Sequence, residues 1–533
     1  MNKEIKYAID YHEETKHSEA KLQMFRHYLD WDNKPRAFKV YPDLPSIPLP
    51  QDFPSPASDA LTCIQSMRPL SPGSSLDLRA LAQILFFTAG ITREMKFDSG
   101  TYYMRAASAT GALYPIELYF VSREISGLPA GVYHFCPGDF SLTELRSGDY
   151  RPKLAAMAGG NPNILSSPVT LAFTSLAWRN AWKYGARSYR HWFWDSGVIA
   201  ANLLAVAISA GLRPALVMGF VDSAVNNLLR LEQGKEAAVV LASIGSRPTG
   251  AASFHDLKPD PEPLAVAANP RYLPLSKREA EYPEIWKLHE ASSLVTNAEV
   301  KEWLSGGIYP PRRVESEDPS PDRQPGQSGG LGDVILRRGS SRRFSHLAIS
   351  QDQLSTILYS STRGVPLDFL KEGGSSVDIY LIANAVDGLA PGHYFYNQHA
   401  NSLERLDTRN EITSRNESGY LCLGQPLFGD ASAVFFMMTD LNAVLKALGN
   451  RGYRACEFEA GVVAGKIYLS SYAQGLGASG STFYDDAVTE LFSPHARGKA
   501  AMIAIGVGIP AYKASPGKIL AARLTKSELE SNQ

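Results

Sequence analysis

The chain contains one segment twice. Residues Arg187 to Asp222 align with Arg451 to Asp486 at a constant offset of 264, and 9 of the 36 aligned pairs are identical. A second matching pair lies upstream in each copy, GLPAGVYHF at 127–135 and GLAPGHYFY at 388–396. A repeat of this length indicates two copies of one structural unit. We therefore predict that the two copies pack as an internal pseudo-dimer.

Each copy is predicted to combine helices with a sheet. The long apolar segments Trp194–Ala210 and Phe458–Gln474 each predict a helix that ends at a glycine. The apolar stretches that predict strands are 116–121, 237–244, 377–382 and 500–505. Helices around a central sheet favour an α+β fold over a pure helical bundle.

The predicted boundaries divide the chain into five parts. These are an N-terminal appendage (1–55), a first repeat domain (56–250), an interdomain segment with a flexible linker (251–330), a second repeat domain (331–515) and a C-terminal tail (516–533). The linker prediction rests on the stretch PPRRVESEDPSPDRQPGQSGG, which is rich in Pro, Ser, Gly and charge.

Composition argues against several classes of protein. Lys plus Arg total 53 against 54 Asp plus Glu, which disfavours a large nucleic-acid interface. The four cysteines lack CxxC spacing and the histidines form no HExxH pattern, so no disulfide framework and no metal site is predicted. The most apolar run, Val198–Ala210, is shorter than the roughly 20 residues that span a bilayer. We expect a soluble, cytoplasmic protein with no nucleic-acid or membrane partner.

A basic cluster opens copy two. Residues 337–344 read RRGSSRRF, and the next helix is expected to begin at Ser350 with Gln353 completing a capping box. Arginine makes bidentate, charge-assisted bonds with phosphate, so the cluster suits a phosphate monoester; a solvated basic loop is the alternative interpretation. At the offset of the following helix, Arg338, Ser340 and Arg342 fall on Gln65, Met67 and Pro69 of copy one. Copy one therefore lacks the cluster.

A loop of small residues precedes a strand in copy one. The segment from Arg105 to Pro115 reads RAASATGALYP, and its small residues let backbone N–H groups approach a planar ligand closely. An ordinary tight turn is the alternative interpretation. Copy two is 12 residues shorter here, and its remnant LKEGGSSVDIY lacks the pattern. Each copy thus retains an element that the other has lost.

The dipeptide Lys183-Tyr184 also occurs in copy one alone. At the offset of 264, copy two has Ala447-Leu448 in its place. A lysine can act in acid–base chemistry if burial or a neighbouring cation lowers its pKa toward neutrality; a surface dipeptide is the alternative interpretation. Its loss from the copy that also lacks the small-residue loop favours a functional role.

One basic and aromatic set is retained in both copies. Its members are Arg187, Tyr189 and Arg190 in copy one and Arg451, Tyr453 and Arg454 in copy two. Retention in both copies favours a structural role. We expect these arginines to form ion pairs with Asp195 and Glu459 across the repeat interface.

These motifs together resemble those of the nitroreductase-like flavoproteins, and most closely the SagB/ThcOx-type dehydrogenases. RRGSSRRF is similar to the family's RRSxRxF flavin-phosphate motif, and RAASATGALYPIELY to its R-x-PSGGALxPxELY motif. This chain departs from the second motif, with Ala107, Ala109 and Thr110 where Pro, Gly and Gly are usual. The opening DYHEETKHS also resembles the start of these dehydrogenases. The resemblance covers nearly the whole chain apart from the linker and the tail.

The resemblance implies two nitroreductase-like domains, each with a central, mostly antiparallel sheet, and an FMN cofactor between them. In such dimers one subunit holds the FMN phosphate and the other places the small-residue loop against the flavin. Carried onto this chain, Arg338, Ser340 and Arg342 would hold the phosphate and ribityl. The residues that would line the ring or its loop are Arg105, Ser108, Ala109, Thr110 and Gly111. The reciprocal site would lack both elements, so one FMN per chain is expected.

The resemblance also implies a chemistry. A Lys-Tyr pair is the proposed dyad of the azoline-oxidising members, and Lys183 and Tyr184 would fill that role. The leading hypothesis is an FMN-dependent oxidoreductase that passes hydride between substrate and flavin N5, with a small molecule or a modified peptide as substrate. Two alternatives stay open: an NAD(P)H-dependent reductase of nitro or quinone compounds, and a non-catalytic flavin-binding or scaffold subunit of a peptide-modifying complex.

Overall fold

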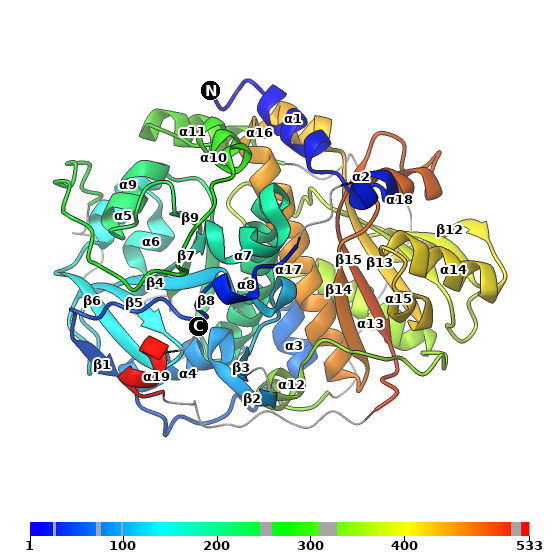
Figure 1. Ribbon diagram of the computed structural model, residues 1–533, viewed down its shortest axis with the longest axis horizontal. Coiled ribbons are helices and arrows are strands. Elements are labelled where there is room, and N and C mark those ends of the chain that lie inside the picture. The colour runs from blue at the N-terminus through cyan, green and yellow to red at the C-terminus, as the bar shows by residue number, and fades with distance from the viewer. Residues whose placement is uncertain are drawn as a thin grey trace.

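Two antiparallel sheets flank a pair of long central helices (Figure 1). The computed structural model describes residues 1–24, 28–70, 76–97, 100–245, 258–308, 328–512 and 524–531. Most of the predicted flexible linker and part of the predicted tail lie outside the described residues. The prediction of an α+β fold with two sheet-containing halves is confirmed.

The first sheet has seven strands. Their order is β1 (Ser46–Pro48), β6 (Ser141–Ser147), β5 (Gly131–Cys136), β4 (Ile116–Ser122), β7 (Val169–Leu176), β9 (Glu236–Gly245) and β8 (Arg213–Val217). All of its pairings are antiparallel. Strands β4, β7 and β9 are buried along their whole length, as expected for strands covered on both faces.

The second sheet repeats this order without a counterpart of β1. It runs β12 (Ser402–Thr408), β11 (Gly392–Asn397), β10 (Asp378–Ala383), β13 (Ala433–Thr439), β15 (Ala500–Gly508) and β14 (Gly477–Ser481), again antiparallel throughout. Its helices are α12 (Leu331–Arg337), α13 (Gln351–Thr362), α14 (Glu411–Leu421), α15 (Pro426–Asp430), α16 (Leu441–Leu448), α17 (Arg451–Ala473) and α18 (Asp485–Leu491). The predicted capping box at Ser350 and Gln353 opens α13.

The helices of the first half follow the same plan. They are α3 (Ala60–Gln65), α4 (Leu78–Ala89), α5 (Arg151–Met157), α6 (Pro162–Ser166), α7 (Ala177–Tyr184), α8 (Ser188–Ser209) and α9 (Asp222–Leu228). Flanking helices are α1 (Lys6–Glu14), α2 (Glu19–Met24), α10 (Pro283–Ala291), α11 (Asn297–Gly306) and α19 (Lys526–Ser531). Helix α19 follows copy two in sequence, yet its Leu529 packs in a cluster with Phe38 and Ile91.

Helices α8 and α17 pack at the pseudo-twofold axis. A Cβ added at Gly197 would lie 2.6 Å from the carbonyl oxygen of Phe458, and one at Gly461 would lie 2.6 Å from that of Trp194. The two glycines are 264 residues apart, so equivalent positions face each other, as they would in a symmetric dimer. Only glycine allows the two helix backbones to approach this closely.

The repeat also includes helices α1 and α10. The His12 ring contacts the Tyr453 hydroxyl at 3.3 Å, and the His289 ring contacts the Tyr189 hydroxyl at 3.3 Å. Only the dipeptide His-Glu, at 12–13 and 289–290, marks this relation in the sequence. The predicted N-terminal appendage and interdomain segment therefore each contribute an equivalent helix to the central interface.

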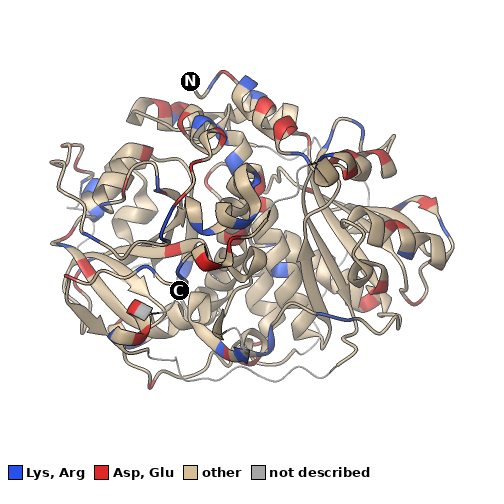
Figure 2. Cartoon of the chain, in the orientation of Figure 1, with Lys and Arg blue, Asp and Glu red and all other residues tan. Residues whose placement is uncertain are grey.

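The longest apolar helical segment lies inside the protein. Among the described residues, one segment, Ala177–Ser209, is long and apolar enough to cross a membrane by length and composition, and 94% of its most apolar window is buried. It comprises α7 and α8, which form part of the central core. Basic and acidic side chains are interspersed over the cartoon in Figure 2.

Candidate functional site

The 12 extra residues of copy one form a hairpin that carries the small-residue loop. Strands β2 (Ile91–Phe97) and β3 (Gly100–Arg105) pair antiparallel, and the loop begins where β3 ends. Arg105 fixes the start of the loop, because its guanidinium donates to the carbonyl of Ala37 at 2.8 Å and packs over the Tyr114 ring. Burial lowers the pKa of Arg105 to about 10. This contact supports the loop.

A buried carboxylate fixes the middle of the loop. Asp195 on α8 accepts hydrogen bonds from the Thr110 backbone N–H at 2.9 Å and from the Thr110 hydroxyl at 2.8 Å. Burial raises the pKa of Asp195 to about 7, although both bonds from Thr110 oppose the rise. In copy two the equivalent Glu459 accepts from Ser375 and Ser376. Each copy thus uses this carboxylate to hold the segment ahead of its sheet.

Tyr184 lies directly against the loop. Gly111 has φ of +63°, and a Cβ added there would lie 2.5 Å from the Tyr184 hydroxyl. The glycine is required both for its left-handed backbone and for this close approach. Gly111 and its neighbour Ala112 are exposed, so the loop presents an open small-residue face beside the tyrosine.

Burial shifts the pKa of both Lys183 and Tyr184. Burial lowers the pKa of Lys183, whose ammonium lies 5.3 Å from the centre of the Tyr184 ring. Burial raises the pKa of Tyr184, and the charge of Asp195 adds to the rise. The His191 ring packs edge-on against Tyr184 at 4.8 Å and bonds to Asn180 at 2.6 Å. His191 and Asn180 were not predicted, because no spacing pattern marks them.

Arg338 joins the two motifs that the sequence placed in different copies. Its guanidinium donates to the carbonyl oxygens of Ala106 and Arg105, each at 2.8 Å. The side chain is buried, and burial lowers its pKa. The basic cluster of copy two therefore does meet the loop of copy one. Two of the Arg338 donor atoms bind backbone, so this residue docks the copies together.

The rest of the cluster surrounds Gly339. The Ser340 hydroxyl is half-buried and lies 3.3 Å from the Tyr468 hydroxyl. Arg342 is exposed, and its backbone N–H donates to the Tyr512 hydroxyl at 3.2 Å. The guanidinium of Arg93, from the hairpin, would lie 3.9 Å from a Cβ added at Gly339. Cations from both copies thus converge on this point.

These residues fit an FMN molecule by the chemistry of their donors. Arg342 and Ser340 could hold a phosphate, with Arg338 beside them. The small residues Ser108, Ala109, Thr110 and Gly111 are at least partly exposed, and Gly111 lies against Tyr184. Among the described residues, no group of three His, Cys, Asp or Glu side chains could hold a metal ion.

The prediction that the paired arginines bind Asp195 and Glu459 is wrong. Arg187 and Arg190 bind Asp485 of copy two, at 3.0 and 2.9 Å. Arg451 and Arg454 bind Asp222 of copy one, each at 2.6 Å. Burial raises the pKa of both aspartates, but the arginines hold it below its ordinary value. Ion pairs across the interface do occur, with different carboxylates.

The reciprocal site in copy two is built differently. Lys466 on α17 is equivalent to Asn202 on α8, which donates to the carbonyls of Phe87 and Ala106 at 3.1 Å. The Lys466 ammonium instead donates to the carbonyls of Arg363 and Gly364. A Cβ added at Gly364 would lie 2.8 Å from the carbonyl of Gln65, so the chain is closed against copy one at this point. Burial lowers the pKa of Lys466 to about 7.

Comparison with known proteins agrees with the architecture. Residues 65–246 match the Nitroreductase family. The "Putative nitroreductase MJ1384" of Methanocaldococcus jannaschii is 29% identical over 174 residues, 33% of this chain and 83% of that protein. The trifolitoxin-processing protein TfxB of Rhizobium leguminosarum bv. trifolii is 32% identical over 205 residues, 37% of this chain and 54% of its own length.

One solved structure is similar over almost the full chain. The crystal structure of a "putative nitroreductase" from Anabaena variabilis has a TM-score of 0.72 and 26% sequence identity. The match covers 95% of this chain and 99% of that one. The arrangement of both sheet-containing halves is therefore shared with that protein.

Proposed function

Because this chain carries a nitroreductase-family domain, we propose that it is an FMN-dependent oxidoreductase of the SagB type with one composite active site. The observation that carries the proposal is the meeting of three elements at one place. The Arg338 guanidinium of copy two binds the Arg105–Ala106 backbone of copy one, and the same loop reaches Tyr184 through Gly111. The equivalent positions of the other site provide neither a basic cluster nor a Lys-Tyr pair.

The residues divide the task between binding and proton transfer. Arg342 and Ser340 would hold the FMN phosphate, and Arg338 holds the small-residue loop where the ring would lie. When bound, FMN supplies a hydride acceptor at its N5 atom. The lowered pKa of Lys183 suits it to take a proton from a substrate carbon. Tyr184, with its raised pKa, keeps its proton and donates a hydrogen bond to the substrate.

We propose azoline oxidation in a modified peptide as the reaction. Loss of a proton and a hydride from adjacent ring atoms turns an azoline into an azole, which uses one base and one hydride acceptor. The similarity to a trifolitoxin-processing protein supports a peptide substrate. The similarity to a protein named as a nitroreductase supports the alternative, reduction of a nitro or quinone compound by NAD(P)H.

Two measurements test the proposal. The absorbance spectrum and flavin content of the purified chain should give one FMN per chain; two would refute the composite site, and a colourless protein that takes up no added FMN would favour the scaffold alternative. Anaerobic mixing with NAD(P)H should leave the bound flavin oxidised on the time scale of turnover. Rapid bleaching would favour the reductase.

A further inference from the structure

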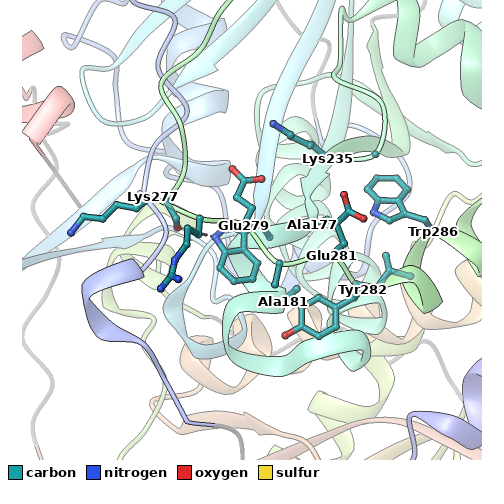
Figure 3. A pocket seen from close by; sticks show the side chains of 14 residues that line it. Ala177, Ala181, Lys235, Lys277, Glu279, Glu281, Tyr282 and Trp286 are labelled. Carbon is teal, nitrogen blue, oxygen red and sulfur yellow. Dashed lines mark hydrogen bonds between the residues drawn. The ribbon is translucent and has the colours of Figure 1, made fainter.

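A cavity of about 330 Å³ opens beside helix α7, away from the basic cluster (Figure 3). The segment 276–286 between the two copies forms one wall, and α7 forms the other. The side chains that give the cavity its chemistry are Trp178, Lys235, Glu279, Glu281, Tyr282 and Trp286. The sequence prediction treated this segment as an interdomain connection and assigned it no ligand.

The cavity adjoins the Lys183-Tyr184 pair. Ala177 and Ala181 line it from α7, and residues four apart on a helix lie on one face, so this face continues to the end of the helix at Tyr184. A Cβ added at Gly185, the next residue, would lie 3.3 Å from the Tyr282 ring. Tyr282 therefore contacts the chain directly after the dyad and lines the cavity as well.

Two of the three cations that line the cavity pair with carboxylates outside it. Lys235 forms an ion pair with Glu232 at 2.9 Å, and Arg278 lies 3.7 Å from Asp30. Glu279 and Glu281 form no ion pair with any residue that the structure describes. Figure 3 shows Lys277 extending away from the other labelled side chains. Burial raises the pKa of Glu279, and the charge of Lys235 opposes this rise without cancelling it.

Aromatic rings complete the lining. The Trp178 indole N–H donates to the Ser276 hydroxyl at 2.8 Å, which fixes this ring at the cavity wall. Trp286 and Tyr282 face the same space from the interdomain segment. The faces of Trp and Tyr rings attract cations, and more strongly when the cation is desolvated. Carboxylates beside aromatic faces thus favour an organic cation over an anion or a neutral group.

We propose that this cavity binds the ammonium or guanidinium of a basic residue in the peptide substrate while the azoline lies at Lys183 and Tyr184. The inference rests on the proposed function for the identity of the substrate. It adds a specificity determinant: a peptide with a lysine or arginine near its azoline is bound in preference to one without. The site makes no covalent change to that residue.

Direct binding tests the cavity without any turnover. Butylguanidinium and butylammonium are titrated into the full-length, flavin-loaded protein while tryptophan fluorescence is recorded, with both glutamates changed to glutamine (E279Q/E281Q) in the test variant. We expect saturable quenching in the wild type and an affinity weakened about tenfold or more in the variant. Glu284→Gln, an exposed glutamate on α10 outside the cavity, should bind as the wild type does. Absence of binding to the wild type, or equal binding by E279Q/E281Q, would overturn the proposal.

A second comparison separates a peptide residue from a free amine. Azoline peptides with lysine, arginine or norleucine at the same position are compared by affinity. A basic residue should tighten binding about tenfold in the wild type and not in E279Q/E281Q. Tight binding of butylammonium with no effect of the peptide residue would overturn the peptide assignment. If no azoline is oxidised but these binding differences remain, the proposed reaction fails while the cation site stands.

Discussion

The two pseudo-equivalent sites at the interface place different residues, Asn202 and Lys466, at one shared helix position. Asn202 and Lys466 occupy the same position in α8 and α17, and both donate to carbonyl oxygens at the edge of the central interface. Beside Asn202 a guanidinium from the other copy, Arg338, binds the same Ala106 carbonyl. Beside Lys466 that guanidinium is absent, since Gln65 replaces it. At the Asn202 site the cation bound to these carbonyls is Arg338, which comes from the other copy. At the other site it is Lys466, which comes from the helix of the same copy.

This difference shows how one scaffold can hold an open site and a closed one. An amide at position 202 leaves room for the incoming arginine, and with it the loop that carries Gly111. A lysine at position 466 satisfies the carbonyls alone, and Gly364 packs against the backbone of Gln65. The fused chain can then keep one site for a ligand and use the other for packing.

The substitution Asn202→Lys should have the largest effect on this difference. It places an ammonium next to the buried Arg338 guanidinium, and two like charges at low dielectric repel strongly. We expect flavin affinity to fall by more than about tenfold, with a lower melting temperature. Flavin content and thermal unfolding measure the two effects.

The converse change provides the control. Lys466→Asn should keep one flavin per chain, because copy two still lacks the hairpin and the basic cluster. Full flavin content in Asn202→Lys, or a second flavin in Lys466→Asn, would contradict the account of the two sites.

Replacing Lys183 should reduce activity without loss of flavin. Removing a general base typically lowers a rate by about 10²–10⁴-fold. Lys183→Ala should therefore lose most of its turnover, and the pH–rate profile should lose the acidic limb, along which activity rises as the lysine loses its proton. Lys446→Ala, an exposed lysine on the equivalent helix α16, is the matched control and should turn over normally. A Lys183→Ala protein with full turnover would exclude the dyad.

Substitutions of Arg338 and Arg342 should distinguish contacts that join the two copies from contacts that bind the ligand. Arg338→Ala removes two charge-assisted bonds across the interface and should lower the free energy of unfolding by about 3 kcal/mol. Arg342→Ala removes an exposed side chain and should change it by less than about 0.5 kcal/mol while weakening FMN binding. Denaturant unfolding and FMN titration of both variants provide the comparison. Equal stability loss in both would contradict the assigned roles.

The last prediction concerns the pH dependence of stability. The pKa of Asp195 lies near 7 in the folded chain and near 3.8 when unfolded, so the folded state binds its proton more tightly. The contribution of Asp195 to the free energy of unfolding is fully present below about pH 4. It is lost as pH rises to about 7, by up to about 1.4 kcal/mol per pH unit. Asp195→Asn should flatten this slope, as measured by denaturant unfolding between pH 4 and 7. An unchanged slope would show that the carboxylate is ionised throughout this range.

The sequence predicted elements better than contacts. The predicted helices Trp194–Ala210 and Phe458–Gln474 end within one residue of α8 and α17, because glycine follows each C-terminus. Their starts were wrong, since the two helices begin earlier, at Ser188 and Arg451. The acidic partners were misassigned because the sequence does not show that Asp195 and Glu459 bind loop residues of their own copies. The copies also lose register after β14. The constant offset pairs Asp222 with Asp486, whereas the structure pairs it with Asp485, one residue earlier. A gap of one residue in the alignment of the two copies cannot be detected from the sequence here, because too few residues around it are identical.

The site was predicted in its parts but not in its orientation. The small-residue loop and the Lys-Tyr pair could be found because each occurs in one copy only. The direction of the Arg338 guanidinium could not be predicted, because it depends on where the end of the β2–β3 hairpin places two backbone carbonyls. The role of Lys466 was missed for the same reason: a lysine in an apolar helix carries no signal of the carbonyls it will meet.

Tyr11 sits between the rings of Tyr189 and Tyr453, at 5.6 and 5.7 Å. It therefore stands on the pseudo-twofold axis, where a strictly symmetric assembly would require two identical side chains to occupy one space. The partner helix α10 places Leu288 at the position equivalent to Tyr11. Two free, identical halves could not make this arrangement, so the covalent link between the copies lets unlike residues share the axis.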